Sequence, residues 1–159
     1  MRLLVSAGLA LLTAAPLAQP KTAPVPSDAR VVKAMDALGL VYETEPNGDY
    51  RLLYEVDDER SQLVWIRPET RSIGELEVRE VFSTAHEYEG EVPTDVALDL
   101  IRLNSGYTLG SWTVEGSRVL FIARIDADAS DAELDAAIGA VLFTADDMEA
   151  ELSGGADEW

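Results

Sequence analysis

The sequence has no cysteine and a single histidine, and these two shortages exclude several kinds of chemistry. Without cysteine there is no disulfide, no thiolate nucleophile and no cysteine-ligated zinc site. The lone His86 cannot form the H-E-x-x-H zinc motif, which needs two histidines. The phosphate motifs G-x-x-x-x-G-K and G-x-G-x-x-G and the nucleophile elbow G-x-S-x-G are also missing. We therefore expect no cofactor and no nucleotide chemistry.

Basic residues are scarce as well, because 12 lysines and arginines face 30 acidic residues and give a net charge of −18. Nucleic acid and anionic membrane surfaces would repel such a chain and are not expected as partners. Cationic partners and bound cations are compatible with the acidity, although its simplest effect is solubility. The length of 159 residues and the hydrophobic share of 47% predict one globular domain.

The N-terminus has the pattern of a secretory signal peptide over residues 1–18. Arg2 precedes an apolar run over residues 3–12, and small residues follow. The run is too short to span a bilayer, so we expect no stable membrane insertion once the segment is removed. A first core helix is the weaker interpretation, because no polar residue divides the run into faces. Residues 19–26 read as an extended linker, and the predicted location is periplasmic or secreted.

Apolar periodicity in residues 27–152 predicts a single α+β domain with a mainly antiparallel sheet. The expected order is helix, four strands, helix, two strands and helix. We expect helices at 27–38, 94–103 and 130–152, and strands at 40–45, 50–56, 61–67, 76–83, 109–115 and 118–125. Ser27 is the expected N-cap and Gly39 the expected C-cap of the first helix, and Pro68 is expected to end the third strand.

The stretch 50–67 is predicted to be a hairpin around which the other elements are arranged. A four-residue loop over 57–60 would pair Tyr54 with Leu63, Leu52 with Trp65 and Tyr50 with Arg67 on one face. Both faces would then carry apolar residues, so each needs a covering layer or a binding partner.

Two features near the C-terminus complete the expected domain. Ser130 and Glu133 form an S-x-x-E capping box. Seven apolar residues then recur at helical spacing, namely Leu134, Ala137, Ile138, Val141, Leu142, Ala145 and Met148. Residues 153–159 are expected to be a flexible acidic tail, and the sequence assigns no role to Trp159.

The strands expected at 109–115 and 118–125 form a second hairpin. Gly116 and Ser117 predict a type II′ turn that pairs Trp112 with Phe121 and Val114 with Val119.

Candidate metal and catalytic residues are few, and none is predicted as a site. The acidic tip 57–59 could attract a cation but reads more simply as a solvated turn. The run from Asp126 begins like a calcium loop, but Asp131 replaces its glycine and Ala137 its bidentate glutamate. His86 lies near Ser83 and several glutamates at spacings that match no known mechanism. An exposed histidine at a strand end is the simpler interpretation.

Four aromatic residues are the remaining candidates, with a partner-binding role. Tyr50, Tyr54, Trp65 and Trp112 have strand spacing, and such residues usually belong to the core. If the helices leave one face of the sheet uncovered, these rings would instead form an apolar patch for a peptide or a second subunit.

The order of elements and several local runs resemble the YbjN family, whose fold is similar to that of type III secretion chaperones. Residues 28–152 carry the resemblance, most specifically the run ALDLIRLNSGYTLGSWTVEGSRVLFIARIDAD, in which Asn104 ends a helix and Gly110, Ser111 and Trp112 open a hairpin. LGLVYETEPNGDYRLLYEV is similar to the opening strands of the family. The resemblance implies a non-enzymatic regulatory or chaperone-like domain that binds protein, with a homodimer as one expected state.

The leading hypothesis is therefore an exported, non-enzymatic domain that binds a protein or peptide. The alternative is a small metal-binding protein or hydrolase that uses His86 and nearby acids. A purely structural component of the cell envelope is a third hypothesis.

Overall fold

The computed structural model describes residues 27–57, 60–157 and 159, and these form an α+β fold. A six-stranded antiparallel sheet combines with three α-helices in the predicted order. The elements are α1 (Ala29–Ala37), β1 (Glu43–Thr44), β2 (Tyr50–Asp57), β3 (Arg60–Ile73), β4 (Leu76–Glu87), α2 (Thr94–Leu103), the short 3₁₀-helix η1 (Asn104–Gly106), β5 (Ser111–Glu115), β6 (Arg118–Asp126) and α3 (Asp131–Ser153). The expected signal peptide and linker lie outside the described residues and stay predictions.

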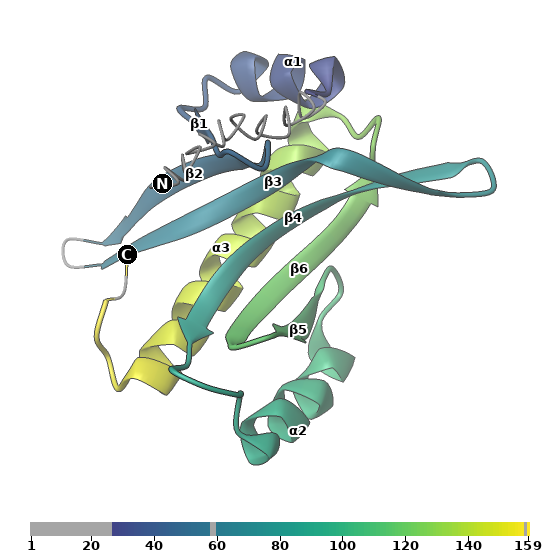
Figure 1. The fold of residues 1–159 in the computed structure, drawn as a ribbon. Helices are drawn as coiled ribbons and strands as arrows, with labels where there is room; N and C mark the ends of the chain where they lie inside the picture. The colour runs from purple at the N-terminus through teal and green to yellow at the C-terminus, as the bar shows by residue number, and fades with distance from the viewer. Residues whose placement is uncertain (1–26, 58–59, 158) are drawn as a thin grey trace, which may run out of the picture.

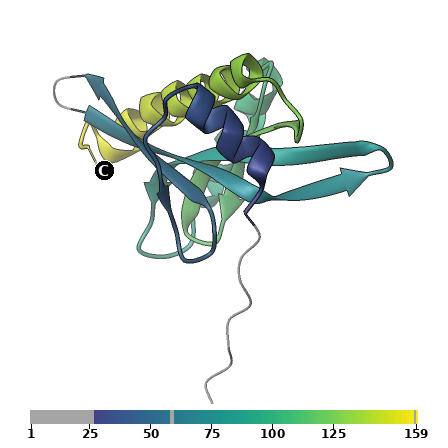
Figure 2. The ribbon, with the colours of Figure 1, turned by 90° about the horizontal axis from the view of Figure 1, so that it is seen from above.

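The strands lie in the order β1-β2-β3-β4-β6-β5, and all neighbours are antiparallel. α3 lies across one face of the sheet, which we call the inner face, and α1 and α2 pack toward its two ends (Figure 1). The opposite face, which we call the outer face, has a smaller apolar cluster to which no described helix contributes. β3 and β4 continue beyond the sheet as a projecting hairpin arm (Figure 2).

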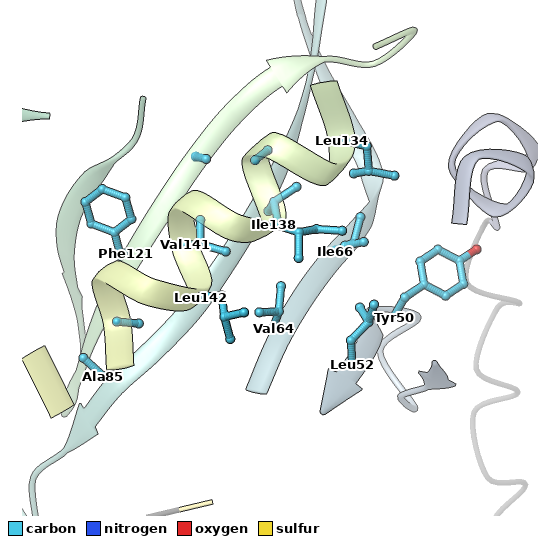
Figure 3. Close-up of a cluster of buried hydrophobic side chains, with 14 of the residues drawn as sticks. Tyr50, Leu52, Val64, Ile66, Ala85, Phe121, Leu134, Ile138, Val141 and Leu142 are labelled. Carbon is cyan, nitrogen blue, oxygen red and sulfur yellow. The ribbon is translucent and has the colours of Figure 1, made fainter. Parts of the chain in front are cut away.

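The inner-face core is built around α3, as the sequence predicts. The Ser130–Glu133 capping box is present, and all seven residues of the predicted apolar stripe are buried. Figure 3 shows Leu134, Ile138 and Leu142 directed at the side chains of β3. Burying each large aliphatic side chain contributes about 1.5–3 kcal/mol, so this stripe is the main source of helix stability.

The ends of α1 differ from the prediction at one position. The N-cap is Asp28 rather than Ser27, because the Asp28 carboxylate accepts a hydrogen bond from the main-chain N–H of Arg30. At the other end Gly39 has φ +69°, and Leu40 donates to the carbonyl of Met35 in a Schellman arrangement. No helix of the described residues is long and apolar enough to cross a bilayer.

The predicted register of the β2–β3 hairpin is wrong by one residue. Only Asp57 and Arg60, beside the tip, pair in the predicted register, and they do so inside the stretch expected to be loop. A bulge between Glu55 and Asp57 then shifts the ladder, so that Tyr50 pairs with Ile66, Leu52 with Val64 and Tyr54 with Gln62. Because side chains alternate across a strand, this shift places Trp65 on the face opposite Tyr50 and Tyr54. Asp58 and Glu59 of the predicted tip lie outside the described residues.

Pro68 does not end β3, contrary to the prediction. The strand runs to Ile73, and a second bulge between Ile66 and Thr70 accommodates the proline. Proline has no N–H to donate to a ladder, and a bulge removes that requirement locally. β4 is likewise longer than predicted, since it continues through His86 to Glu87.

The β5–β6 hairpin has the predicted register, with Trp112 opposite Phe121 and Val114 opposite Val119. A type II′ turn requires positive φ at its first central residue only. Gly116 has φ +64°, whereas Ser117, like every non-glycine residue of the described chain, has negative φ. Gly110 is also necessary, because a Cβ atom there would lie 2.5 Å from the ring of Phe121.

Asn104, which ends α2, closes the edge of β5. Its carbonyl oxygen accepts from the main-chain N–H of Trp112 at 2.6 Å, and its amide donates to the Trp112 carbonyl at 3.2 Å. The side chain thus replaces a neighbouring strand at this point and blocks edge-to-edge pairing. Within α2, Leu100 is buried and Ile101 is 65% exposed.

We predict that Asn104→Ala lowers the free energy of unfolding by about 1–3 kcal/mol, because both polar main-chain groups of Trp112 lose their partners. Urea denaturation followed by circular dichroism measures the change. Ser105→Ala is the control, since this exposed neighbour donates only to the Arg102 carbonyl and should shift stability by less than about 0.5 kcal/mol. Equal losses for the two variants would contradict the role of Asn104.

Candidate functional site

The four candidate aromatic residues do not form one surface. Tyr50 is 3% and Trp112 is 5% exposed, and both belong to the inner-face core. Tyr54 is half-buried against the same core. Trp65 is half-buried on the outer face, where the bulge in β2 directs it. Of the four, only Trp65 is therefore positioned to contact a partner on the outer face.

The outer face has an apolar cluster centred on Trp65 and Phe82. The two rings are stacked, with centroids 5.5 Å apart and an interplanar angle of 10°. Leu120 and Ile122 of β6 complete the cluster and are buried. Offset stacking of this kind contributes about 0.5–1.5 kcal/mol beyond the burial itself. The result is an aromatic platform, in which Trp65 is half-buried and Phe82 is 4% exposed, on a sheet face that carries no described helix.

Arg67 borders this platform and connects it to charged residues. Its guanidinium carbon lies 4.7 Å from the centroid of Phe82, and the group forms an ion pair with Glu80. Arg124 reaches the same Glu80 carboxylate at 2.8 Å. Glu80 is buried, so two guanidinium groups surround one carboxylate that has little contact with water.

The main chain at Arg67 is held from below by a buried arginine. Arg79 is 1% exposed and donates to the carbonyls of Arg67 at 2.7 Å and Pro68 at 3.1 Å. Its guanidinium also pairs with the Asp28 carboxylate at 2.6 Å. The bulge leaves these carbonyls without ladder partners, and Arg79 supplies the missing donors. The position of Arg67 on the outer face thus depends on an ion pair on the inner one.

Asp28 connects this pair to the start of α1. Besides capping the helix, its carboxylate binds the Arg30 guanidinium at 2.7 Å, and Arg30 in turn binds Glu77 at 2.8 Å. The hydrogen bond from Arg30, followed by those from the Arg30 main chain and Arg79, holds the pKa of Asp28 well below its usual range against the opposing effect of burial. Hydrogen bonds from Arg30 and Thr70 lower the pKa of Glu77 to about 2.

A groove runs along the outer face beside Arg67. It has two lobes of about 510 and 470 Å³, which share Asn47, Asp49 and Arg67 in their lining. The first lobe continues along the β3 bulge, and the second reaches Trp65 and Phe82. Four arginines line the two lobes, namely Arg67, Arg71, Arg118 and Arg124. Four carboxylates face them, from Glu45, Asp49, Glu69 and Glu80, so the groove is close to neutral on a strongly acidic chain.

The C-terminal residues return to this face. Gly154 and Gly155 both have positive φ and turn the chain away from α3. The main-chain N–H of Ser61 on β3 then donates to the Asp157 carboxylate at 3.2 Å, and the Ser61 hydroxyl donates to the main-chain oxygen of Trp159 at 2.6 Å. The Trp159 ring meets Trp65 edge to face, with centroids 6.2 Å apart.

The residues of the alternative hypothesis do not converge on a metal site. His86 is half-buried on β4, where its ring packs edge to face on Tyr88 at 4.5 Å. Ser83 is fully buried and donates to the Leu63 carbonyl. Across residues 27–57, 60–157 and 159, no group of three or more histidine or acidic side chains could hold a metal ion.

Sequence reasoning missed three residues of this site. Arg79 alternates normally along β4, so its burial follows only from the bulge above it. Ser61 is the second residue of β3 and has no distinctive pattern. Trp159 could have been noticed as an aromatic residue in an acidic tail, but only the fold shows that it reaches β3.

We predict that Asp28→Asn lowers the free energy of unfolding by about 2–4 kcal/mol at neutral pH, because the buried Arg79 loses its counter-charge while the helix cap is retained. Chemical denaturation measures the loss. Asp36→Asn on the same helix is the matched control, because Asp36 is exposed and its replacement should cost less than about 0.5 kcal/mol. A loss no larger than that of the control would contradict the counter-charge role.

The same ion pair makes stability depend on acid pH. A carboxyl group whose pKa is lowered by folding stabilises the protein fully above its unfolded pKa of about 4, and this contribution disappears as the pH falls toward the folded value. We therefore expect the stability difference between the wild type and Asp28→Asn to be constant at neutral pH and to shrink from pH of about 4 downward. Denaturation curves at several pH values test this, and a difference unchanged at pH of about 2 would contradict it.

No protein-family model matches the chain, and no curated protein matches it. The resemblance to the YbjN family therefore stays a prediction, and function must be argued from the geometry of the outer face.

Proposed function

We propose that the protein is a non-enzymatic, exported binding domain that takes an extended protein or peptide segment on the outer face of its sheet. The single observation that carries this proposal is the C-terminal segment, which places a carboxylate, a main-chain oxygen and an indole ring on this face. A surface that accommodates Asp157 and Trp159 of its own chain has the shape and polarity to accommodate another segment.

The chemistry of the face supports binding of this kind. Trp65 and Phe82 provide a stacked aromatic platform, and aromatic residues are enriched among those that dominate binding energy. Arg67 lies over the same platform with a preorganised guanidinium group. The neighbouring groove is long enough to continue the contact along the β3 bulge. A YbjN-like or secretion-chaperone-like role, periplasmic or secreted, agrees with this proposal, as does a homodimer.

The test is selection of a random peptide library against the immobilised full-length chain. We expect the selected peptides to lose at least tenfold in affinity for Trp65→Ala, which corresponds to about 1.4 kcal/mol or more. Phe143→Ala is the matched control, because this exposed aromatic residue of α3 lies away from the outer face. Circular dichroism checks that both variants are folded.

Amide chemical shifts provide a second readout that does not depend on a variant. Peptide binding should move the signals of Leu63, Trp65, Phe82 and Ile122 and leave those of the helix α3 stripe in place. Selected peptides that bind Trp65→Ala as tightly as the wild type, or shifts confined to the helices, would exclude the outer face as the binding surface.

The metal-binding alternative has its own test. A metal ion that binds only the folded chain raises the midpoint temperature of thermal unfolding by mass action. We expect no rise with excess calcium or zinc at neutral pH, and His86→Ala should behave as the wild type does. A midpoint that rises with either metal, and that no longer rises in His86→Ala, would favour the alternative.

A further inference from the structure

Three chemical groups of Asp157 and Trp159 contact β3. The Asp157 carboxylate accepts from the Ser61 N–H, the Trp159 main-chain oxygen accepts from the Ser61 hydroxyl, and the Trp159 ring contacts Trp65. Ser61 pairs with Glu55 at the edge of the β2 bulge, where the ladder is interrupted. The tail therefore binds where the sheet itself offers an unused donor.

One polar group of Trp159 lacks a hydrogen-bond partner within the described part of the chain. Its indole N–H is buried and has no hydrogen-bond acceptor among the described residues. A buried donor without a partner costs about 1–3 kcal/mol, which offsets much of what the ring contact contributes. This cost lowers the net stability of the contacts between the tail and β3.

The connection to α3 lets the tail leave without disturbing the domain. α3 ends at Ser153, and the Gly154 N–H is already bonded to the Ala150 carbonyl. Gly155 also donates to the Ala150 carbonyl, so the helix end is complete before the tail begins. The contacts of Asp157 and Trp159 with β3 are not needed to cap the helix.

From these observations we infer that Asp157 and Trp159 act as an intramolecular competitor on the outer face, and that this face recognises partner segments with a carboxylate two positions before an aromatic residue. The inference rests on the proposed function. It commits the partner to one chemistry, an acidic-x-aromatic segment of a protein or peptide.

Charge is compatible with this partner despite the acidity of the chain. The groove next to Trp65 contains as many arginines as carboxylates, and Arg67 and Arg118 line its second lobe. At physiological ionic strength, charges beyond about 8 Å are largely screened, so the local balance matters more than the net charge of the chain.

The experiment measures binding of a labelled SGGADEW peptide to two full-length chains, the wild type and the double variant Asp157→Ala/Trp159→Ala, whose tail no longer competes. A short tether gives an effective concentration of about 1 mM, so a peptide with a dissociation constant of about 0.1 mM should bind the wild type about tenfold more weakly than the double variant. Adding Trp65→Ala to the double variant should remove binding, whereas adding Phe143→Ala should leave it unchanged.

Two altered peptides define the chemistry. SGGANEW, which lacks the carboxylate next to Ser61, and SGGADEA, which lacks the ring, should each bind the double variant at least fivefold more weakly. Equal binding of the SGGADEW peptide to the wild type and the double variant, or no saturable binding to the double variant, would overturn the inference. Sedimentation of the wild type over a wide range of concentrations tests whether copies exchange their tails. A dimer that dissociates in the double variant would also overturn the inference, because the tail would then bind a second copy.

This result is distinguishable from failure of the proposed function. If peptides selected from the library bind the wild type and the double variant equally, and depend on Trp65 in both, then the outer face binds segments but the tail is no competitor. If those peptides ignore Trp65 altogether, both proposals fail.

Discussion

The outer face depends on one extra residue in β2. The bulge between Glu55 and Asp57 shifts the ladder by one position, and alternation then sends Trp65 to the face opposite Tyr50 and Tyr54. Without the bulge, Trp65 would share a face with Tyr50 and Tyr54. Arg60, next to the bulge, binds the Asp146 carboxylate of α3 at 2.6 Å, so the helix holds the hairpin tip in this register.

The bulge in β3 is likewise stabilised by a residue from another strand, the buried Arg79. The bulge at Pro68 leaves carbonyls that Arg79 satisfies, and Asp28 satisfies Arg79. Burying a charge is costly unless it is paired and hydrogen-bonded. The described partners of the buried Arg79 come from two other segments, the bulge in β3 and the start of α1. The start of α1, the bulge in β3 and the position of Arg67 therefore form one cooperative unit, and a change in any of them should reach the binding face.

Local patterns were enough to predict the elements but not the site. α3 and the β5–β6 register follow from a capping box, an apolar stripe and a two-residue turn, all of which are contained in short stretches of sequence. The bulges are not, because residues distant in the chain stabilise them: Asp146 at the first and Asp28 at the second. A one-residue error in register was sufficient to group Tyr50, Tyr54 and Trp65 on one face when the fold separates them.

A half-buried tryptophan on a sheet face that carries no described helix is a hazard as well as a proposed binding surface. Exposed apolar patches promote unwanted association, and a chain without cysteine has no disulfide to protect it against unfolding. A tail that competes for the outer face, as inferred above, would reduce the hazard and keep the surface available. It covers Trp65 when no partner is present and yields to a segment that fits better. If the tail is such a competitor, the indole N–H of Trp159, which is unpartnered among the described residues, weakens its hold by about 1–3 kcal/mol, which favours displacement by a segment whose polar groups are all satisfied.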